Sequence, residues 1–96
     1  MDKIEQKFLE SWERCRKEAE GLGARMRPMT PEDAMRTAHR VLSGSRYSDG
    51  FAVLERLGRL DLSLEALAVD RRFTALFSDD EANNALSRLL EAGYHF

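Results

Sequence analysis

The stretch "SDDEANNALSRLLEAG", residues 78–93, carries the clearest structural signal in the chain. Ser78 and Glu81 form the S-x-x-E pattern of a capping box, in which each side chain accepts from a free backbone N–H of the other residue. Gly93 is the residue type that commonly follows the end of a helix. Apolar residues recur between them at helical spacing, and we expect these to be buried: Ala82, Ala85, Leu86, Leu89 and Leu90. The stretch therefore predicts one complete amphipathic helix.

The residues before this helix predict a series of shorter helices. One should begin after Ser48 and end before Gly58, and a second should be capped by Ser63. The stretch "RRFTALF", residues 71–77, predicts a further turn. The apolar residues expected to be buried in these helices are Phe51, Leu54, Leu57, Leu64 and Leu67.

A helix start is also predicted at "TPED", residues 30–33. Thr30 has the side chain of an N-cap, and Pro31 occupies the first helical position, where proline is tolerated. Before it, residues 21–29 read "GLGARMRPM" and combine two glycines with Pro28. Because proline disfavours helical geometry in the residue before it, this segment is the one candidate linker.

The N-terminal residues predict a longer helix from about Asp2 to Glu20, ended by Gly21. Its narrow apolar stripe contains Ile4, Phe8, Trp12, Cys15 and Ala19. No stretch of the chain alternates with the two-residue period of a strand. We therefore expect an all-α protein, a small bundle of five or six short helices in which a longer N-terminal amphipathic helix (1–20) is joined by a Gly/Pro linker (21–29) to a compact helical domain (30–96).

Composition limits the class of protein. Ninety-six residues suffice for one domain. The 15 basic and 17 acidic residues give a net charge of −2, so we do not expect strong binding to a polyanion. One cysteine cannot form an internal disulfide, and the charged N-terminus lacks the apolar core of a secretory signal. We expect a soluble, cytoplasmic protein with no membrane partner. Twelve arginines against three lysines suggest a GC-rich, bacterial coding sequence.

The sequence offers little for catalysis. Cys15 lies in an apolar stripe, where a small buried hydrophobe is expected. His39 has Arg36 and Arg40 near it and no carboxylate placed to orient it as a base. Two distant histidines and one cysteine give no metal-ligand spacing, and no Gly-rich phosphate-binding motif occurs. We expect no enzyme activity, no metal, no cofactor and no small-molecule substrate.

Partner binding remains, and the first candidates are Phe8, Leu9 and Trp12. Large apolar and aromatic residues dominate protein interfaces. The alternative is that this stripe simply closes the bundle, and both readings hold if the helix packs across a dimer. At the other end, Tyr94 follows Gly93 and is expected to pack against the last helix as part of its cap. Phe96 then remains available to a partner.

Nucleic-acid binding is the alternative function. Residues 49–68 have the outline of a helix-turn-helix, and Arg56, Arg59, Arg71 and Arg72 could contact phosphates. The second helix of that motif, however, offers only Glu65 and aliphatic residues to base edges, where arginine, asparagine or glutamine is expected. We therefore interpret the chain as a small accessory or regulatory protein that binds another protein or a second copy of itself.

Overall fold

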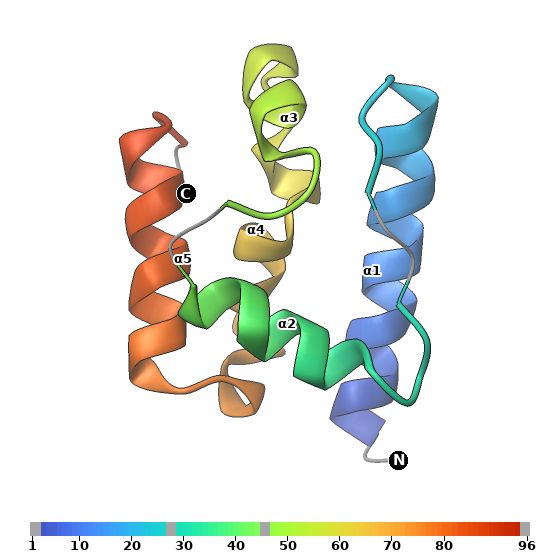
Figure 1. The fold of residues 1–96 in the computed structure, drawn as a ribbon, viewed down its shortest axis with the longest axis vertical. Coiled ribbons are helices and arrows are strands. Elements are labelled where there is room, and N and C mark those ends of the chain that lie inside the picture. The colour runs from blue at the N-terminus through green and yellow to red at the C-terminus, as the bar shows by residue number, and fades with distance from the viewer. Residues whose placement is uncertain (1–2, 27–28, 45–46, 95–96) are drawn as a thin grey trace.

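The computed structural model describes residues 3–26, 29–44 and 47–94, and every regular element in these ranges is a helix (Figure 1). The elements are α1 (Lys3–Gly21), α2 (Ala34–Ser43), α3 (Phe51–Leu57), η1 (Leu60–Leu62), α4 (Leu64–Ala68), η2 (Thr74–Leu76) and α5 (Asp79–Glu91), where η marks a short 3₁₀ helix. The predicted all-α bundle of short helices with a longer N-terminal helix is confirmed.

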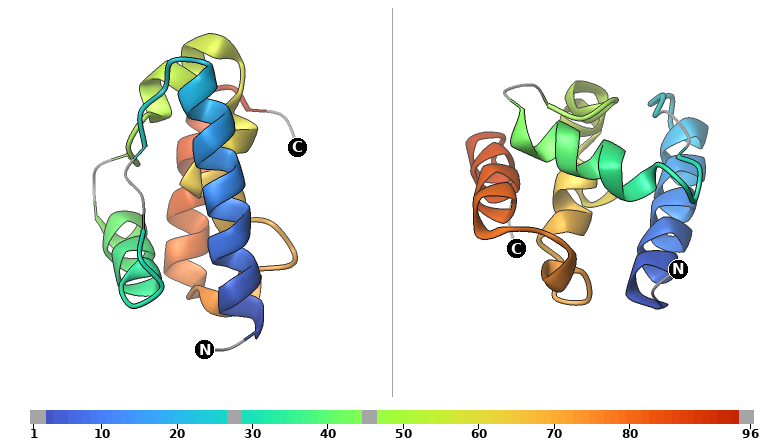
Figure 2. Two further views of the ribbon diagram at one scale, coloured as in Figure 1. Left: turned by 90° about the vertical axis from the view of Figure 1, so that its right-hand side faces the viewer. Right: turned by 60° about the horizontal axis from the view of Figure 1, so that its bottom comes forward.

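Most of the helices form one layer, and α2 crosses it. Figure 1 shows α1 and α5 at opposite sides of the molecule, with α3 and α4 between them. Figure 2 shows that α2 lies across one face of this layer. The closest packing of α5 is against α4 and α2. Helices far apart in sequence therefore meet at the α2–α4–α5 junction.

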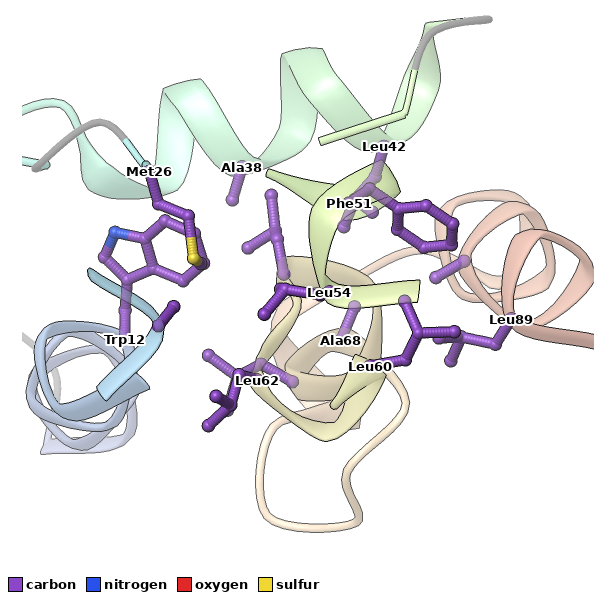
Figure 3. Packing of buried hydrophobic residues seen from close by; sticks show 14 of the residues in the cluster. Trp12, Met26, Ala38, Leu42, Phe51, Leu54, Leu60, Leu62, Ala68 and Leu89 are labelled. Carbon is purple, nitrogen blue, oxygen red and sulfur yellow. The ribbon is translucent and has the colours of Figure 1, made fainter. Parts of the chain in front are cut away.

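One hydrophobic core joins all the helices. Figure 3 shows side chains from every α-helix and from the segment after α1 pointing toward a common centre. The largest fully buried residues include Phe8, Leu54 and Leu89, which come from three different helices. Burial of this kind stabilises the fold by about 25 cal/mol for each Å² of apolar surface removed from water.

Two predicted helix starts are confirmed at atomic detail. The Ser63 hydroxyl accepts a hydrogen bond from the backbone N–H of Ala66 at 3.1 Å. At the start of α5, Ser78 Oγ accepts from the N–H of Glu81 at 3.1 Å, and the Glu81 carboxylate accepts from the N–H of Ser78 at 2.9 Å. Both halves of the capping box are therefore present.

Two other helix ends differ from the prediction. α1 extends to Gly21, and the left-handed position belongs to Gly23 (φ 96°), where the N–H of Ala24 bonds the carbonyl of Ala19 at 2.9 Å. Thr30 does not cap α2. Its backbone N–H instead donates to the Asp33 carboxylate at 3.0 Å, so "TPED" forms a turn and α2 begins at Ala34.

The segment after α1 packs into the core. Ala24 and Met26 are buried, and Gly50 lies directly against them. Gly50 has φ 78°, and a Cβ atom there would come within 3.1 Å of the Arg25 carbonyl oxygen and of Met26 Cγ. Glycine is required by both the backbone angle and the space. Residues 27–28 lie outside the described ranges, so the predicted linker and three-part division stay predictions.

Three leucines predicted to be core residues are exposed instead: Leu57, Leu86 and Leu90. On α5, the buried positions are Glu81, Ala85, Arg88 and Leu89. The helix is thus rotated relative to the orientation that its apolar stripe predicted. The reason lies in the polar contacts that α5 makes with α2 and α4.

Candidate functional site

The structure places the predicted aromatic contact residues of α1 inside the molecule. Phe8 is fully buried, and its ring meets those of Phe73 and Phe77 edge-on at 5.4 and 5.5 Å. Trp12 is 2 % exposed, and Leu9 is half-buried. Phe8 and Trp12 therefore close the bundle, as the alternative interpretation expected, and offer a partner almost no surface. Phe96 lies outside the described residues.

The arginines of the nucleic-acid alternative are in part bonded to the chain's own carboxylates. Arg59 pairs with Glu18 and Asp61, each at 3.1 Å. Arg72 pairs with Asp70 at 3.1 Å, while Arg56 and Arg71 are exposed.

The helix that would read bases is enclosed. Four of the five residues of α4 are buried, and they are Leu64, Glu65, Leu67 and Ala68. A recognition helix must present a face to the DNA groove. The geometry therefore gives the helix-turn-helix interpretation no support.

A buried polar network at the α2–α4–α5 junction was not predicted. Glu65 is 0 % exposed and Arg88 is 6 % exposed, and Arg88 Nη1 lies 3.2 Å from Glu65 Oε2. The backbone N–H and the hydroxyl of Ser48 also donate to the Glu65 carboxylate. Glu65, the one polar side chain that the helix-turn-helix alternative would offer to base edges, is therefore enclosed. A buried carboxylate is tolerated here because it has several charged and polar donors.

Arg88 also holds the end of α2. Its Nη2 donates to the backbone carbonyl oxygens of Val41 at 3.2 Å and Gly44 at 2.6 Å. The last carbonyls of a helix lack intrahelical partners and carry partial negative charge, so a cation there is favourable. One guanidinium thus joins α2, α4 and α5. Glu65 and Arg88 are both buried and bonded to each other, which is typical of a structural role.

A second polar contact links α2 to the start of α5. His39 Nδ1 lies 2.7 Å from Glu81 Oε2, and the Ser43 hydroxyl donates to the same oxygen at 3.2 Å. A carboxylate therefore does orient His39, contrary to the sequence-based expectation. Burial favours a higher pKa for Glu81, but the Ser78 N–H and His39 outweigh it and lower the pKa. The Ser43 hydroxyl bonds the Glu81 carboxylate and not the His39 imidazole. Ser43, His39 and Glu81 therefore lack the contact between nucleophile and base that a catalytic triad requires.

Cys15 shows no sign of activation. Its side chain is half-buried, and burial raises the pKa of the thiol above its usual value. A raised pKa keeps the thiol protonated at neutral pH, and the protonated form is a poor nucleophile. Within the described ranges, no three His, Cys, Asp or Glu side chains are grouped so that they could hold a metal ion.

Three large apolar or aromatic side chains are exposed on or beside α5, and we call them the α5 surface: Tyr47, Leu86 and Leu90. Leu86 and Leu90 lie one turn apart on α5 and are 36 % and 58 % exposed. Tyr47 is 51 % exposed, yet its ring stacks on Phe51 at 4.7 Å and its hydroxyl donates to Glu91 at 3.3 Å. This surface was not predicted from the sequence, because the helical spacing of the apolar residues favours burial of both leucines.

The comparisons with known proteins give no relationship: no family model matches the chain, and neither a curated protein nor a solved structure matches it. None of the helices in the described part of the chain has both the length and the apolar character needed to cross a bilayer.

Proposed function

We propose that this chain is a small accessory or regulatory protein that acts by binding another protein through the α5 surface. The observation that carries the proposal is the exposure of Leu86 and Leu90 on a helix whose opposite face is buried. Scattered exposed leucines are ordinary, but two on adjacent turns of one helix face form a row that a partner can cover.

Tyr47 adds a residue type suited to binding. Tyrosine is enriched at interface hot spots. The Tyr47 ring stacks on Phe51, and the guanidinium of Arg88 lies 5.8 Å from the centre of the same ring. A side chain already fixed in one orientation loses less conformational entropy when a partner binds it.

The α5 surface is small for a stable homodimer. A standard interface buries about 800 Å² on each partner. Three side chains that are each partly covered within the chain supply only a fraction of this area. The α5 surface would therefore be the centre of a larger contact with a different protein, and self-association through it alone would be weak.

The test compares a Leu86→Ser/Leu90→Ser double variant with a Leu57→Ser control. Leu57 is 45 % exposed and lies on α3, so the control removes a similar exposed side chain elsewhere. Chemical cross-linking in cells of origin, followed by identification of bound proteins, should show a partner with wild type and control that is lost with the double variant. Equal capture by all three proteins would refute the role of the α5 surface.

Two measurements separate the remaining possibilities. Light scattering over a range of protein concentration reports self-association, which the double variant should reduce if a second copy is the partner. Binding to a labelled DNA duplex at increasing salt tests the alternative function, because phosphate contacts weaken steeply as salt rises. Strong salt-dependent DNA binding that survives the double substitution would favour the nucleic-acid interpretation.

A further inference from the structure

The charged side chains that α5 exposes are all acidic. Asp79, Asp80 and Glu91 are exposed, whereas Arg88, the one basic residue of this helix, is buried. The two leucines of the α5 surface therefore lie on a helix whose solvent side carries negative charge.

The carboxylates lie beyond both ends of the leucine pair. Asp79, Leu86 and Leu90 are seven and four residues apart, so they share one face of the helix. The rise of an α-helix places Asp79 about 10 Å before Leu86. At the other end, Glu91 directly follows Leu90. An apolar row with a carboxylate beyond each end is complementary to a segment with apolar residues between two cations.

These carboxylates are not neutralised by the described part of the chain. None of the ion pairs between described residues includes Asp79, Asp80 or Glu91. The acidic residues around Arg59 and Arg72 differ, because each of them pairs with one of these arginines. The negative charges beside the leucines are therefore available to a cation on another molecule.

The helix dipole explains only part of this charge. Asp79 and Asp80 lie in the first turn of α5, where acidic side chains are favoured. Glu91 is the last residue of α5, where the dipole favours a basic side chain instead. Its carboxylate accepts a hydrogen bond from the Tyr47 hydroxyl at 3.3 Å, which links it to the α5 surface. A residue that breaks a local rule in this way is expected at a functional site.

We propose that the partner covers the α5 surface with a basic amphipathic helix. This inference rests on the proposed function and specifies the chemistry of the partner. Two apolar residues of the partner, one turn apart, pack against Leu86 and Leu90. Lysine or arginine side chains beyond them lie near Asp79 at one end and Glu91 at the other. A helix laid along α5 reaches both ends, because the 13 residues of α5 span about 20 Å. Nucleic acids are disfavoured here, since their phosphates would meet carboxylates.

Three synthetic helical peptides of about 15 residues serve as probes, a length at which an alanine-rich helix begins to be stable in water. All three carry two leucines one turn apart on one face. The positions beyond the leucines on that face hold lysine in the first peptide, glutamine in the second and glutamate in the third. Amide chemical shifts of the isotope-labelled, full-length protein report where each peptide binds and how tightly.

We expect the lysine peptide to shift the amide signals of residues 79–91 in a saturable way. It should bind at least threefold more tightly than the glutamine peptide, and the glutamate peptide should bind most weakly. The advantage of lysine over glutamine should shrink as sodium chloride is added, because salt screens exposed charges.

Two variants test the assignment of residues. Glu91→Gln keeps an oxygen that can accept from Tyr47 but removes the charge, and Asp79→Asn removes the charge at the other end. Each should reduce the preference for the lysine peptide over the glutamine peptide, and the two together should remove most of it. The matched control is Glu10→Gln, which neutralises an exposed carboxylate of α1 at the opposite side of the molecule (Figure 1). It should keep the wild-type preference, and circular dichroism checks that every variant is folded.

The Leu86→Ser/Leu90→Ser variant separates this inference from the proposed function. If it binds the lysine peptide as wild type does, the leucines take no part and the proposed function itself is refuted. If binding needs the leucines but all three peptides bind equally, the α5 surface stands and the basic partner is overturned. An unchanged lysine preference in the Asp79→Asn/Glu91→Gln variant also overturns it, as does a lysine peptide that gives no saturable shifts on α5.

Discussion

Removal of the Arg88 guanidinium tests the buried network most directly. In Arg88→Met, a side chain of similar length keeps the packing, but Glu65 loses its cation and the carbonyl oxygens of Val41 and Gly44 lose their donor. Breaking a buried ion pair from one side costs about 3–5 kcal/mol. A domain of this size has a total stability of about 5–15 kcal/mol, so the variant should lose about a fifth of it or more.

Urea denaturation followed by Trp12 emission measures this loss, since the indole is buried in the folded state. The matched control, Arg56→Met, changes an exposed arginine and should shift the free energy of unfolding by less than about 0.5 kcal/mol. The double variant Arg88→Met/Glu65→Leu removes both charges and should be less destabilised than the sum of the two single variants. A loss below about 1 kcal/mol in Arg88→Met would refute the reasoning.

Three further predictions concern local contacts. Ser78→Ala should lower stability by about 1 kcal/mol because α5 loses its N-cap, whereas Ser87→Ala on the exposed face should have little effect, as urea midpoints will show. The pKa of Glu81 is lowered from 4.5, so its stabilising contribution is complete above pH 4.5 and lost as pH falls through the lower, folded-state pKa. Glu81→Gln should therefore flatten the pH dependence of stability in this acidic range, and an unchanged slope would contradict it. Gly50→Ala should lower the free energy of unfolding, as measured by thermal denaturation, more than Gly23→Ala does. An alanine at the positive φ of either position costs about 1–2 kcal/mol, but only at Gly50 would the added Cβ atom also crowd neighbouring atoms.

Local signals in the sequence predicted the parts of the fold that depend on neighbouring residues. The caps at Ser63 and Ser78 involve donors only three residues away, so the pattern of side chains contains the whole interaction. The helical spacing of apolar residues likewise placed Phe8, Leu54 and Leu89 in the core.

The rotation of α5 was not predictable in the same way. Its apolar stripe favoured burial of Leu86 and Leu90, whereas the structure buries Arg88. The partner that makes this burial favourable is Glu65, which is 23 residues away on α4, and no local pattern records that pairing. One signal was present: Glu65 is the only charged residue in the run "LSLEALAV", residues 62–69, whose other members except Ser63 are apolar. The position of the α5 surface follows from this pair and was therefore missed with it.

The way in which Arg88 bridges three helices has a consequence for the order of folding. Its partners are 23 residues away at Glu65 and 44 to 47 residues away at Gly44 and Val41. Such distant groups meet only after the chain between them has collapsed, so we expect these bonds to be absent from the rate-limiting barrier. Loss of the guanidinium should then accelerate unfolding and leave the refolding rate nearly unchanged, a φ-value close to zero. The Arg88 side chain would then stabilise the assembled molecule without stabilising the folding transition state, and so prolong the lifetime of the native state.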